Sequence, residues 1–308
     1  MPLLIGVPLI CFITSYITTS KWLVVCKDHK LVARDIHKRK DVIVPRIGGL
    51  PAALISTFVV FFVDFESILR ELIAVISMIA ILLGLLDDTI SLRDLEKVLI
   101  PIAPFALLGT SLNTIDVLGF SFKGYLALAL VALIGTYSVN ATNTLAGFNG
   151  LEAGLSVIIG SFLSLLAFLK GFKMASLLLA SFSACYLAFL LFNFYPAKAF
   201  PGNCSTFQMG AFLAAISIVL GLVTPFLIMM IPHALDFFLK LLCWRKMKEK
   251  CPTRIDENGF LTPPPHLSLI GLLLRTRKMR ELELVLFIYF IEILLGLISL
   301  IVTLVYLP

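Results

Sequence analysis

A chain of 308 residues with 59% hydrophobic and 14% charged residues carries more apolar surface than a soluble domain of this length can bury. Its mean hydropathy of +1.02 indicates a lipid bilayer as solvent. The formal net charge of +6 could suggest nucleic acid, but the basic residues lie in short segments beside apolar stretches, so we expect no nucleic-acid partner. The six cysteines are scattered without disulfide or metal spacing, which favours buried or reduced thiols.

Ten apolar stretches follow one another along the chain. In order they cover 2–25, 48–63, 70–86, 98–112, 124–142, 153–169, 174–192, 208–222, 223–243 and 282–306. The sequence therefore predicts an all-α, polytopic membrane protein, a single domain over residues 1–308 with about ten transmembrane helices. The first stretch lacks a cleavage site, and we expect it to stay in the mature protein. The eighth and ninth stretches could instead form one kinked span, which would move the C-terminus across the membrane.

The basic residues are distributed unevenly between the two sides of this predicted bundle. Most of them lie in connections on one side, at about 26–47, 87–97, 143–152, 193–207 and 244–281. The connections on the other side carry only Arg70, Lys123, Lys170 and Lys173. Because positive charge is retained on the cytoplasmic side, the five basic connections are predicted to be cytoplasmic and both termini to face outward. An active site is then expected at the cytoplasmic face.

The first polar motif follows the third stretch and includes Asp87, Asp88, Arg93 and Lys97. Adjacent carboxylates repel one another at a membrane surface, so their placement suggests a compensating metal ion or basic group. A magnesium ion bound by carboxylates and by substrate phosphate oxygens would meet this need. Lys97 could contribute a positive charge to the same phosphates. The alternative is a solvated helix end with ordinary capping aspartates.

The second motif covers residues 140–154 and combines asparagines, glycines and Glu152 without any basic residue. Glycine permits close approach of the backbone to a flat ligand, and asparagine presents a donor and an acceptor to the edge of a base. These residue types suit uracil or ribose. The alternative is a tight turn between two helices.

Later polar segments add further candidates. Residues 193–205 combine aromatic side chains with a Pro-Gly turn; the aromatic residues could stack on a base, and Asn203 could direct an oxygen at a metal. The alternative is an aromatic belt at the membrane interface. In the long basic loop 244–281, Arg254 or His266 could contact a diphosphate or sugar, and residues 258–259 predict a hairpin turn. His233 and Asp236 are unusual because they lie inside a predicted span.

Together these segments resemble the polyprenyl-phosphate N-acetylhexosamine-1-phosphate transferases. The likeness is closest to the dolichyl-phosphate N-acetylglucosaminephosphotransferase branch and its archaeal members. It rests on residues 140–154, which read Asn-Ala-Thr-Asn-Thr-Leu-Ala-Gly-Phe-Asn-Gly-Leu-Glu-Ala-Gly, and on the spacing of Asp87, Asp88, Arg93 and Lys97. The order of motifs and spans agrees over nearly the whole chain.

The resemblance implies transfer of N-acetylglucosamine-1-phosphate from UDP-N-acetylglucosamine to a polyprenyl or dolichyl phosphate, giving UMP and a polyprenyl-diphosphate sugar. Such a reaction initiates lipid-linked glycan synthesis, for protein N-glycosylation or for cell-envelope glycans. Magnesium, or manganese in its place, is the implied cofactor. Family positions implied as catalytic are Asp87, Asp88 and Lys97. Those implied for metal binding are Asn143 and Asn203, and those implied for the nucleotide sugar are Gly147, Asn149, Phe200 and Arg254.

Two departures from the family pattern leave alternatives open. Asn203 stands where the family commonly has an aspartate that binds magnesium, and the chain has Thr253-Arg254 after its Cys-Pro pair where the dolichol branch has an Arg-His-Arg cluster. A catalytically weakened or silent homologue is therefore one alternative, and a transporter is another, suggested by His233 and Asp236. The membrane would be the plasma membrane in an archaeon and the endoplasmic reticulum membrane in a eukaryote. A homodimer is compatible with these expectations.

Overall fold

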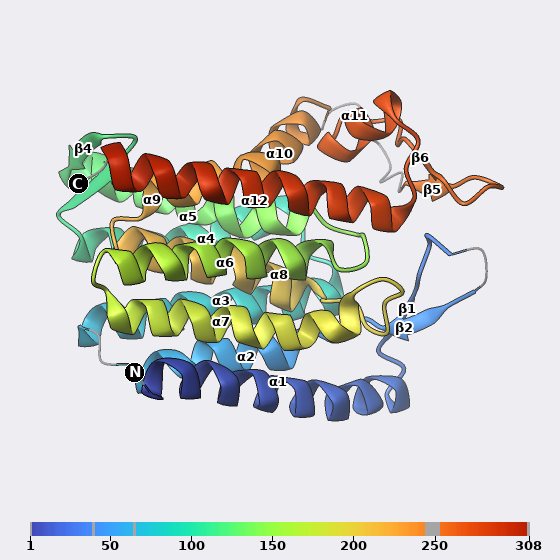
Figure 1. Cartoon of the computed structure of the whole chain (residues 1–308), viewed down its shortest axis with the longest axis horizontal. Coiled ribbons are helices and arrows are strands. Elements are labelled where there is room, and N and C mark those ends of the chain that lie inside the picture. Colours follow the sequence, from blue (N-terminus) through green and yellow to red (C-terminus); the bar gives the residue numbers. More distant parts are fainter. Residues whose placement is uncertain (1, 39–40, 64–65, 244–252, 307–308) are drawn as a thin grey trace.

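The structure is a computed structural model that describes residues 2–38, 41–63, 66–243 and 253–306. Its long helices run side by side along one common direction, whereas α10 (Ile231–Cys243) and α11 (Leu269–Thr276) lie obliquely to them (Figure 1). The start of the first helix, the end of the last helix and one β-hairpin lie at one end of this bundle. Two other hairpins and a short helix project from the opposite end, which we call the polar end.

Six helices of the described residues are long and apolar enough to cross a membrane. They are α1 (Pro2–Asp28), α3 (Ser67–Ile90), α5 (Gly124–Thr144), α6 (Leu151–Leu169), α7 (Lys173–Asn193) and α12 (Glu281–Tyr306). The pair α9 (Val223–Met229) and α10 (Ile231–Cys243) is bent by 64° and makes a seventh if it forms one span. The other helices are α2 (Leu50–Phe58) with the 3-10 helix η1 (Val59–Phe62), α4 (Asp94–Ser111), α8 (Asn203–Val219) and α11 (Leu269–Thr276).

Every predicted apolar stretch is therefore helical, which confirms a mainly helical membrane protein, whereas the count of ten spans stays a prediction. Several predicted boundaries are wrong. Helix α3 continues to Ile90, so Asp87 and Asp88 lie in its last turns and not in a loop. Helix α8 begins at Asn203 and not at 208, because its polar first turns are buried and hydrogen-bonded; Gln208, for example, accepts a bond from the Tyr186 hydroxyl at 2.6 Å. A hydropathy pattern does not reveal that buried polar side chains are hydrogen-bonded by residues from other helices.

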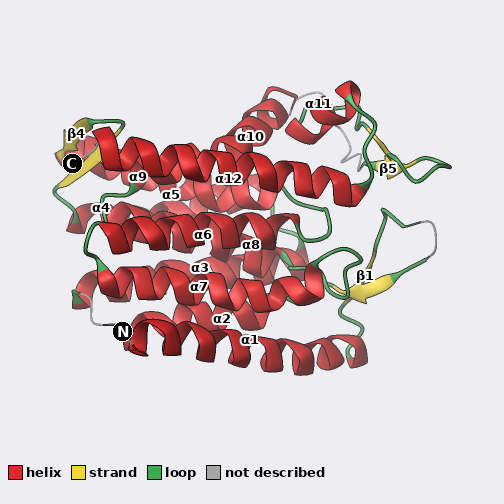
Figure 2. Cartoon of the chain, in the orientation of Figure 1, coloured by secondary structure: helices red, strands yellow, loops and turns green. Residues whose placement is uncertain are grey.

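Within the described residues, three two-stranded antiparallel hairpins complete the fold (Figure 2). They pair β1 (Val32–Arg34) with β2 (Ile43–Pro45), β3 (Thr114–Val117) with β4 (Phe120–Lys123), and β5 (Arg254–Ile255) with β6 (Leu261–Thr262). The hairpin turn predicted at residues 258–259 is confirmed, and Gly259 there has a φ of +81° that favours glycine. The other two hairpins were not predicted.

The centre of the bundle is α8, which is buried along most of its length and packs against α3 and α5. Two glycines permit these close approaches. A Cβ at Gly84 of α3 would overlap the backbone of Asn203 and Cys204, and one at Gly210 of α8 would overlap Ser138 of α5. These contacts bring the polar-end termini of α3, α5 and α8 together.

Candidate active site

Asp87 is the most highly connected acidic residue among the predicted catalytic positions. Its Oδ1 lies 2.9 Å from the Lys97 ammonium and accepts the Leu92 amide at 2.9 Å. Its Oδ2 accepts the Asn203 side-chain amide at 2.8 Å. The carboxylate is buried, so these partners replace the water that it loses. Lys97 in the first turn of α4 is thus the compensating basic group that the adjacent carboxylates led us to expect.

Asp88 is held separately, at the beginning of α8. Its Oδ2 accepts the Cys204 backbone amide at 3.4 Å, and the side chain is buried. The free amides at the N-terminus of a helix favour a carboxylate at this position. Neighbouring acids in the sequence are therefore compensated by different groups, Asp87 by a lysine and Asp88 by a helix end.

Asn143, in the last turn of α5, joins this group through α8. Its Oδ1 accepts the Thr206 hydroxyl at 2.7 Å, and the same hydroxyl lies 3.2 Å from the Asn203 carbonyl oxygen. We call Asp87, Asp88, Lys97, Asn143 and Asn203 the helix-end cluster. All five were predicted from the sequence, and four separate helices bring them together.

The residues predicted for nucleotide binding lie beside this cluster, but they do not form one connected group. The Gly147 amide donates to Glu152 Oε1 at 2.7 Å, with a φ of +106° at the glycine. Phe200 is fixed through its backbone, since its amide donates to the Pro45 carbonyl oxygen at 2.8 Å. Asn149 is buried, and its amide group donates to Asp35 Oδ2 at 3.0 Å.

Arg254 is less closely integrated. It lies on β5 and is exposed, and within the described residues its side chain makes no ion pair. Its neighbour Thr253 does contact the polar end through its carbonyl oxygen, 3.1 Å from His37 Nε2. The preceding Cys-Pro pair of the predicted motif, residues 251–252, lies outside the described residues.

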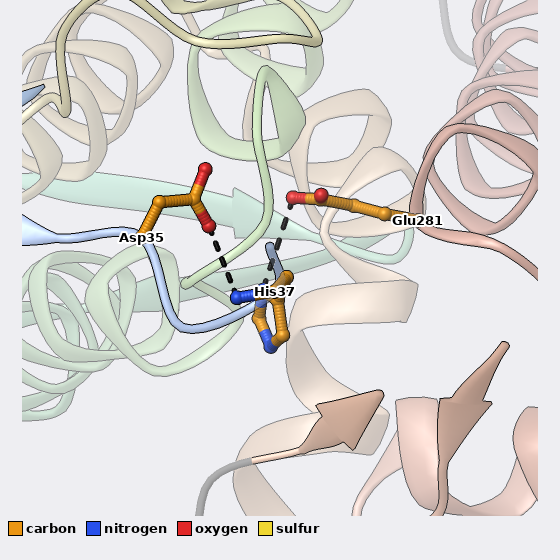
Figure 3. A group of neighbouring side chains, drawn as sticks. All are labelled: Asp35, His37 and Glu281. Carbon is orange, nitrogen blue, oxygen red and sulfur yellow. Dashed lines mark hydrogen bonds and ion pairs between the residues drawn. The ribbon is translucent and has the colours of Figure 1, made fainter. Parts of the chain in front are cut away.

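A second buried polar group lies at the polar end, and of its residues only Asn149 was predicted from the sequence. It consists of Asp35, His37, Lys38, Asn149 and Glu281, which we call the loop clasp. Lys38 Nζ lies 2.7 Å from Glu281 Oε2 and 3.5 Å from Asp35 Oδ2. The Asn149 backbone amide donates to Glu281 Oε1 at 2.8 Å. Figure 3 shows Asp35 and Glu281 on either side of His37. The clasp thus ties the 29–49 connection, the 145–150 loop and the start of α12 together.

His37 lies at the centre of the loop clasp. Its ring stacks on Phe148 with centroids 4.7 Å apart, and its Nδ1 lies 3.8 Å from Glu281 Oε1. Burial lowers the pKa of His37, although Glu281 and Asp35 oppose that shift by stabilising the charged ring. The sequence signal was the polar run Asp35-Ile36-His37-Lys38, but nothing in it indicated Glu281, which lies far along the chain.

The two groups differ as candidate metal sites. Asp35, His37 and Glu281 bring potential ligand atoms within 4.8 Å of one another, but the Lys38 ammonium already lies between the two carboxylates. The potential ligands of the helix-end cluster are carboxylate and carboxamide oxygens, which Mg²⁺ prefers, and its lysine pairs with Asp87 alone of the two adjacent aspartates. Its residues therefore fit magnesium better than the loop clasp does.

His233 and Asp236, which the sequence predicts to lie inside a span, have a different role. Asp236 Oδ2 lies 2.7 Å from the Lys240 ammonium, and Asp236 Oδ1 accepts the Leu269 amide at 3.0 Å. Lys240 also donates to the Thr144 carbonyl oxygen at 2.6 Å. This ion pair fastens α10 to α11 and to the end of α5, and His233 is buried nearby on α10. Such fixed pairing is typical of a structural contact and weakens the transporter alternative.

Comparison with known proteins supports the motif-based expectation. The family described as "Glycosyl transferase family 4" matches residues 71–221. A protein of Methanocaldococcus jannaschii named as a glycosyltransferase is 35% identical over 88% of this chain and 87% of its own length. A Saccharolobus solfataricus protein is 31% identical over 95% of this chain and 94% of its own, and its name describes a UDP-N-acetylglucosamine–dolichyl-phosphate N-acetylglucosaminephosphotransferase.

Bacterial proteins match over a shorter part of the chain. One from Bacillus subtilis, 31% identical over 65% of this chain and 59% of its own, is named as an undecaprenyl-phosphate N-acetylglucosaminyl 1-phosphate transferase. The family match includes all five residues of the helix-end cluster, and the archaeal matches extend over nearly the entire chain. The chain belongs to glycosyl transferase family 4, which confirms its resemblance to the polyprenyl-phosphate N-acetylhexosamine-1-phosphate transferases.

Proposed function

We propose that the protein transfers N-acetylglucosamine-1-phosphate from UDP-N-acetylglucosamine to a polyprenyl phosphate such as dolichyl phosphate, with release of UMP. The observation that carries this proposal is the helix-end cluster, in which a lysine, two carboxylates and two carboxamides converge at one end of a membrane bundle. The names of the archaeal relatives support the choice of donor and acceptor. The product would initiate a lipid-linked glycan.

The proposed reaction is a phosphoryl transfer. An oxygen of the lipid phosphate attacks the β-phosphorus of the nucleotide sugar, and the bond from that phosphorus to the bridging oxygen breaks, so that UMP leaves with the electron pair. Lys97 would stabilise negative charge on the diphosphate. Asp87 already has partners on both oxygens, so Asp88 is the better candidate to orient or deprotonate the lipid phosphate.

Magnesium fits the donor set of the helix-end cluster. Asn143, Asn203 and the two aspartates would hold it together with substrate phosphate oxygens. When bound, the ion would neutralise charge on the diphosphate. Asn203 contributes one negative charge fewer than the usual family aspartate, so weaker metal binding is expected.

The loop clasp would position the nucleotide. It holds both the backbone and the side chain of Asn149, while Phe200 is held against β2 on a neighbouring segment. A base between these residues would meet an amide edge and an aromatic face. The clasp residues themselves are positioning residues in this proposal, because they act through Asn149.

The proposed topology places the polar end in the cytoplasm, with ten spans and an active site open to nucleotide sugars. The basic connections support this orientation. The shorter helices α2, α4 and α8 would complete the count of ten, embedded beside longer neighbours. With archaeal relatives as a guide, the plasma membrane is the proposed location.

Purified protein incubated with radiolabelled UDP-N-acetylglucosamine, dolichyl phosphate and Mg²⁺ tests the proposal. We expect UMP and a chloroform-soluble labelled lipid to form in equimolar amounts. Neither product should form when EDTA is present from the start. Failure to form the labelled lipid with dolichyl or undecaprenyl phosphate, under Mg²⁺ or Mn²⁺, would count against the proposed reaction.

A catalytically weakened homologue is the second candidate, because Asn203 donates its amide to Asp87 in place of presenting a carboxylate. Asn203→Asp distinguishes the two. For an active enzyme adapted to asparagine, the new carboxylate would repel Asp87, and turnover should fall or stay level. A gain in turnover of tenfold or more at unchanged UDP-sugar affinity would support the weakened homologue.

A further inference from the structure

A pocket of about 420 Å³ lies at the polar end between α1, strand β2 and the end of α7. One face of α1 lines it with Leu23, Val24 and Lys27. Phe192 and Lys198 line it from the α7 side. The helix-end cluster and the loop clasp contribute none of its lining residues, so the pocket is separate from both.

Two lysines set this pocket apart from the other polar features. Lys27 lies in the last turn of the long apolar helix α1, and Lys198 lies in the connection that follows α7; both are exposed. Neither makes an ion pair among the described residues, whereas Lys38, Lys97 and Lys240 each contact a carboxylate. The pocket therefore combines an apolar wall with two positive charges that have no acidic partner there.

The position of the pocket matches the level of lipid headgroups. Lys27 lies in the last turn of a helix long enough to span a bilayer, and Val24, one turn earlier, is exposed. A lipid hydrocarbon chain could lie along the apolar face of α1, with a phosphate between the lysines. A free phosphate could use the lysines but would gain nothing from the apolar wall.

We propose that this pocket binds an anionic phospholipid of the surrounding bilayer, with its phosphate at Lys27 and Lys198 and its hydrocarbon chain along α1. The occupant differs from the polyprenyl phosphate acceptor, whose reacting phosphate must reach the helix-end cluster. The lipid would also stabilise the position of Phe200 in the candidate active site, through strand β2. Strand β2 forms part of the pocket wall, and its Pro45 carbonyl oxygen accepts the amide of Phe200 at 2.8 Å.

Native mass spectrometry of protein released from nanodiscs tests the assignment. Phosphatidylglycerol should be retained at several-fold higher occupancy than phosphatidylcholine of the same acyl composition. The double substitution Lys27→Gln and Lys198→Gln should abolish this preference. Lys21→Gln is the matched control, since Lys21 is exposed on the same helix but does not line the pocket, and it should leave the preference intact. Thermal unfolding of each variant verifies that it is folded.

The outcomes separate the alternatives. Equal retention of the two lipids by the wild type, or a preserved preference in the double variant, would overturn the proposal. Displacement of phosphatidylglycerol by millimolar glycerol phosphate would show a site for soluble phosphate and also overturn it. Displacement by equimolar dolichyl phosphate would assign the pocket to the acceptor and would likewise overturn the proposal. Asp87→Asn should bind phosphatidylglycerol like the wild type, so the result does not depend on the proposed reaction.

Discussion

The helix-end cluster and the loop clasp contain similar residue types, but different structural elements carry them. Each buries two carboxylates with one lysine and at least one asparagine. The helix-end cluster projects from α3, α4, α5 and α8, whose glycine contacts fix their separation. The loop clasp mainly joins connecting segments, and Glu281 at the first residue of α12 is its attachment to the bundle. In the proposed function, the helices therefore hold the reacting phosphates, while the connecting segments position the nucleotide.

The largest effect is expected from a substitution that disrupts the helix-end cluster. Asp87→Asn keeps the shape of the side chain but removes the charge that pairs with Lys97. We expect kcat to fall about 10²–10⁴-fold, the range for loss of a catalytic acid or base, or of a group that positions one. Radiolabel transfer measures it, with Asp94→Asn as the control, since Asp94 is exposed and lies 3.8 Å from the same lysine. Equal loss in both variants would contradict the assignment.

Gly84→Ala tests whether helix spacing matters to that cluster. The new Cβ meets backbone atoms of Asn203 and Cys204 and should push α3 away from α8. We expect a loss of about 1–3 kcal/mol in stability, together with reduced kcat. Gly6→Ala on α1, where a Cβ meets nothing within 4 Å, is the control for thermal unfolding and turnover. Unchanged activity in Gly84→Ala would show that spacing is not critical.

Lys38→Met separates the clasp from the cluster by its kinetic effect. It leaves the Asp35 and Glu281 carboxylates buried without their lysine, so the 145–150 loop should loosen. We expect the KM for UDP-N-acetylglucosamine to rise about tenfold while kcat changes less. The reason is that the lost contacts stabilise the bound substrate and the transition state equally. Adding Glu281→Gln should restore part of the affinity. A fall in kcat at unchanged KM would contradict the proposal that the loop clasp serves nucleotide binding and the helix-end cluster serves catalysis.

The smallest expected effect concerns the pH response of the clasp. Burial lowers the pKa of His37 from its ordinary value of 6.5, so the unfolded chain binds this proton more readily than the folded protein does. The stabilising contribution is then fully present above pH 6.5 and is lost as the pH falls through the folded-state pKa. His37→Gln should show a flatter decline in melting temperature between pH 7.5 and 5. Superimposable pH profiles would argue against this role for His37.

Much of the fold follows from local sequence because membrane helices satisfy their backbone hydrogen bonds internally. Each apolar stretch is therefore recognisable by itself, and the stretch at 124–142 corresponds closely to α5. The boundaries of α3 and α8 were harder, since their polar turns at Asp87 and Asn203 look like loop sequence. These turns are helical because the end of α3 and the beginning of α8 satisfy each other's polar groups through hydrogen bonds. The two segments are distant in the sequence, so local sequence does not reveal this pairing.

The sequence by itself determined the membrane character, the helical fold, the uneven basic charge and the residues of the helix-end cluster. Those features are recorded in composition and in short motifs. Only the tertiary structure decided that Lys97 pairs with Asp87, that Glu281 completes a clasp around Asn149, and that Lys27 and Lys198 share one pocket. The physical reason is that buried charges are stable only with partners, and those partners come from segments that chain order does not bring together.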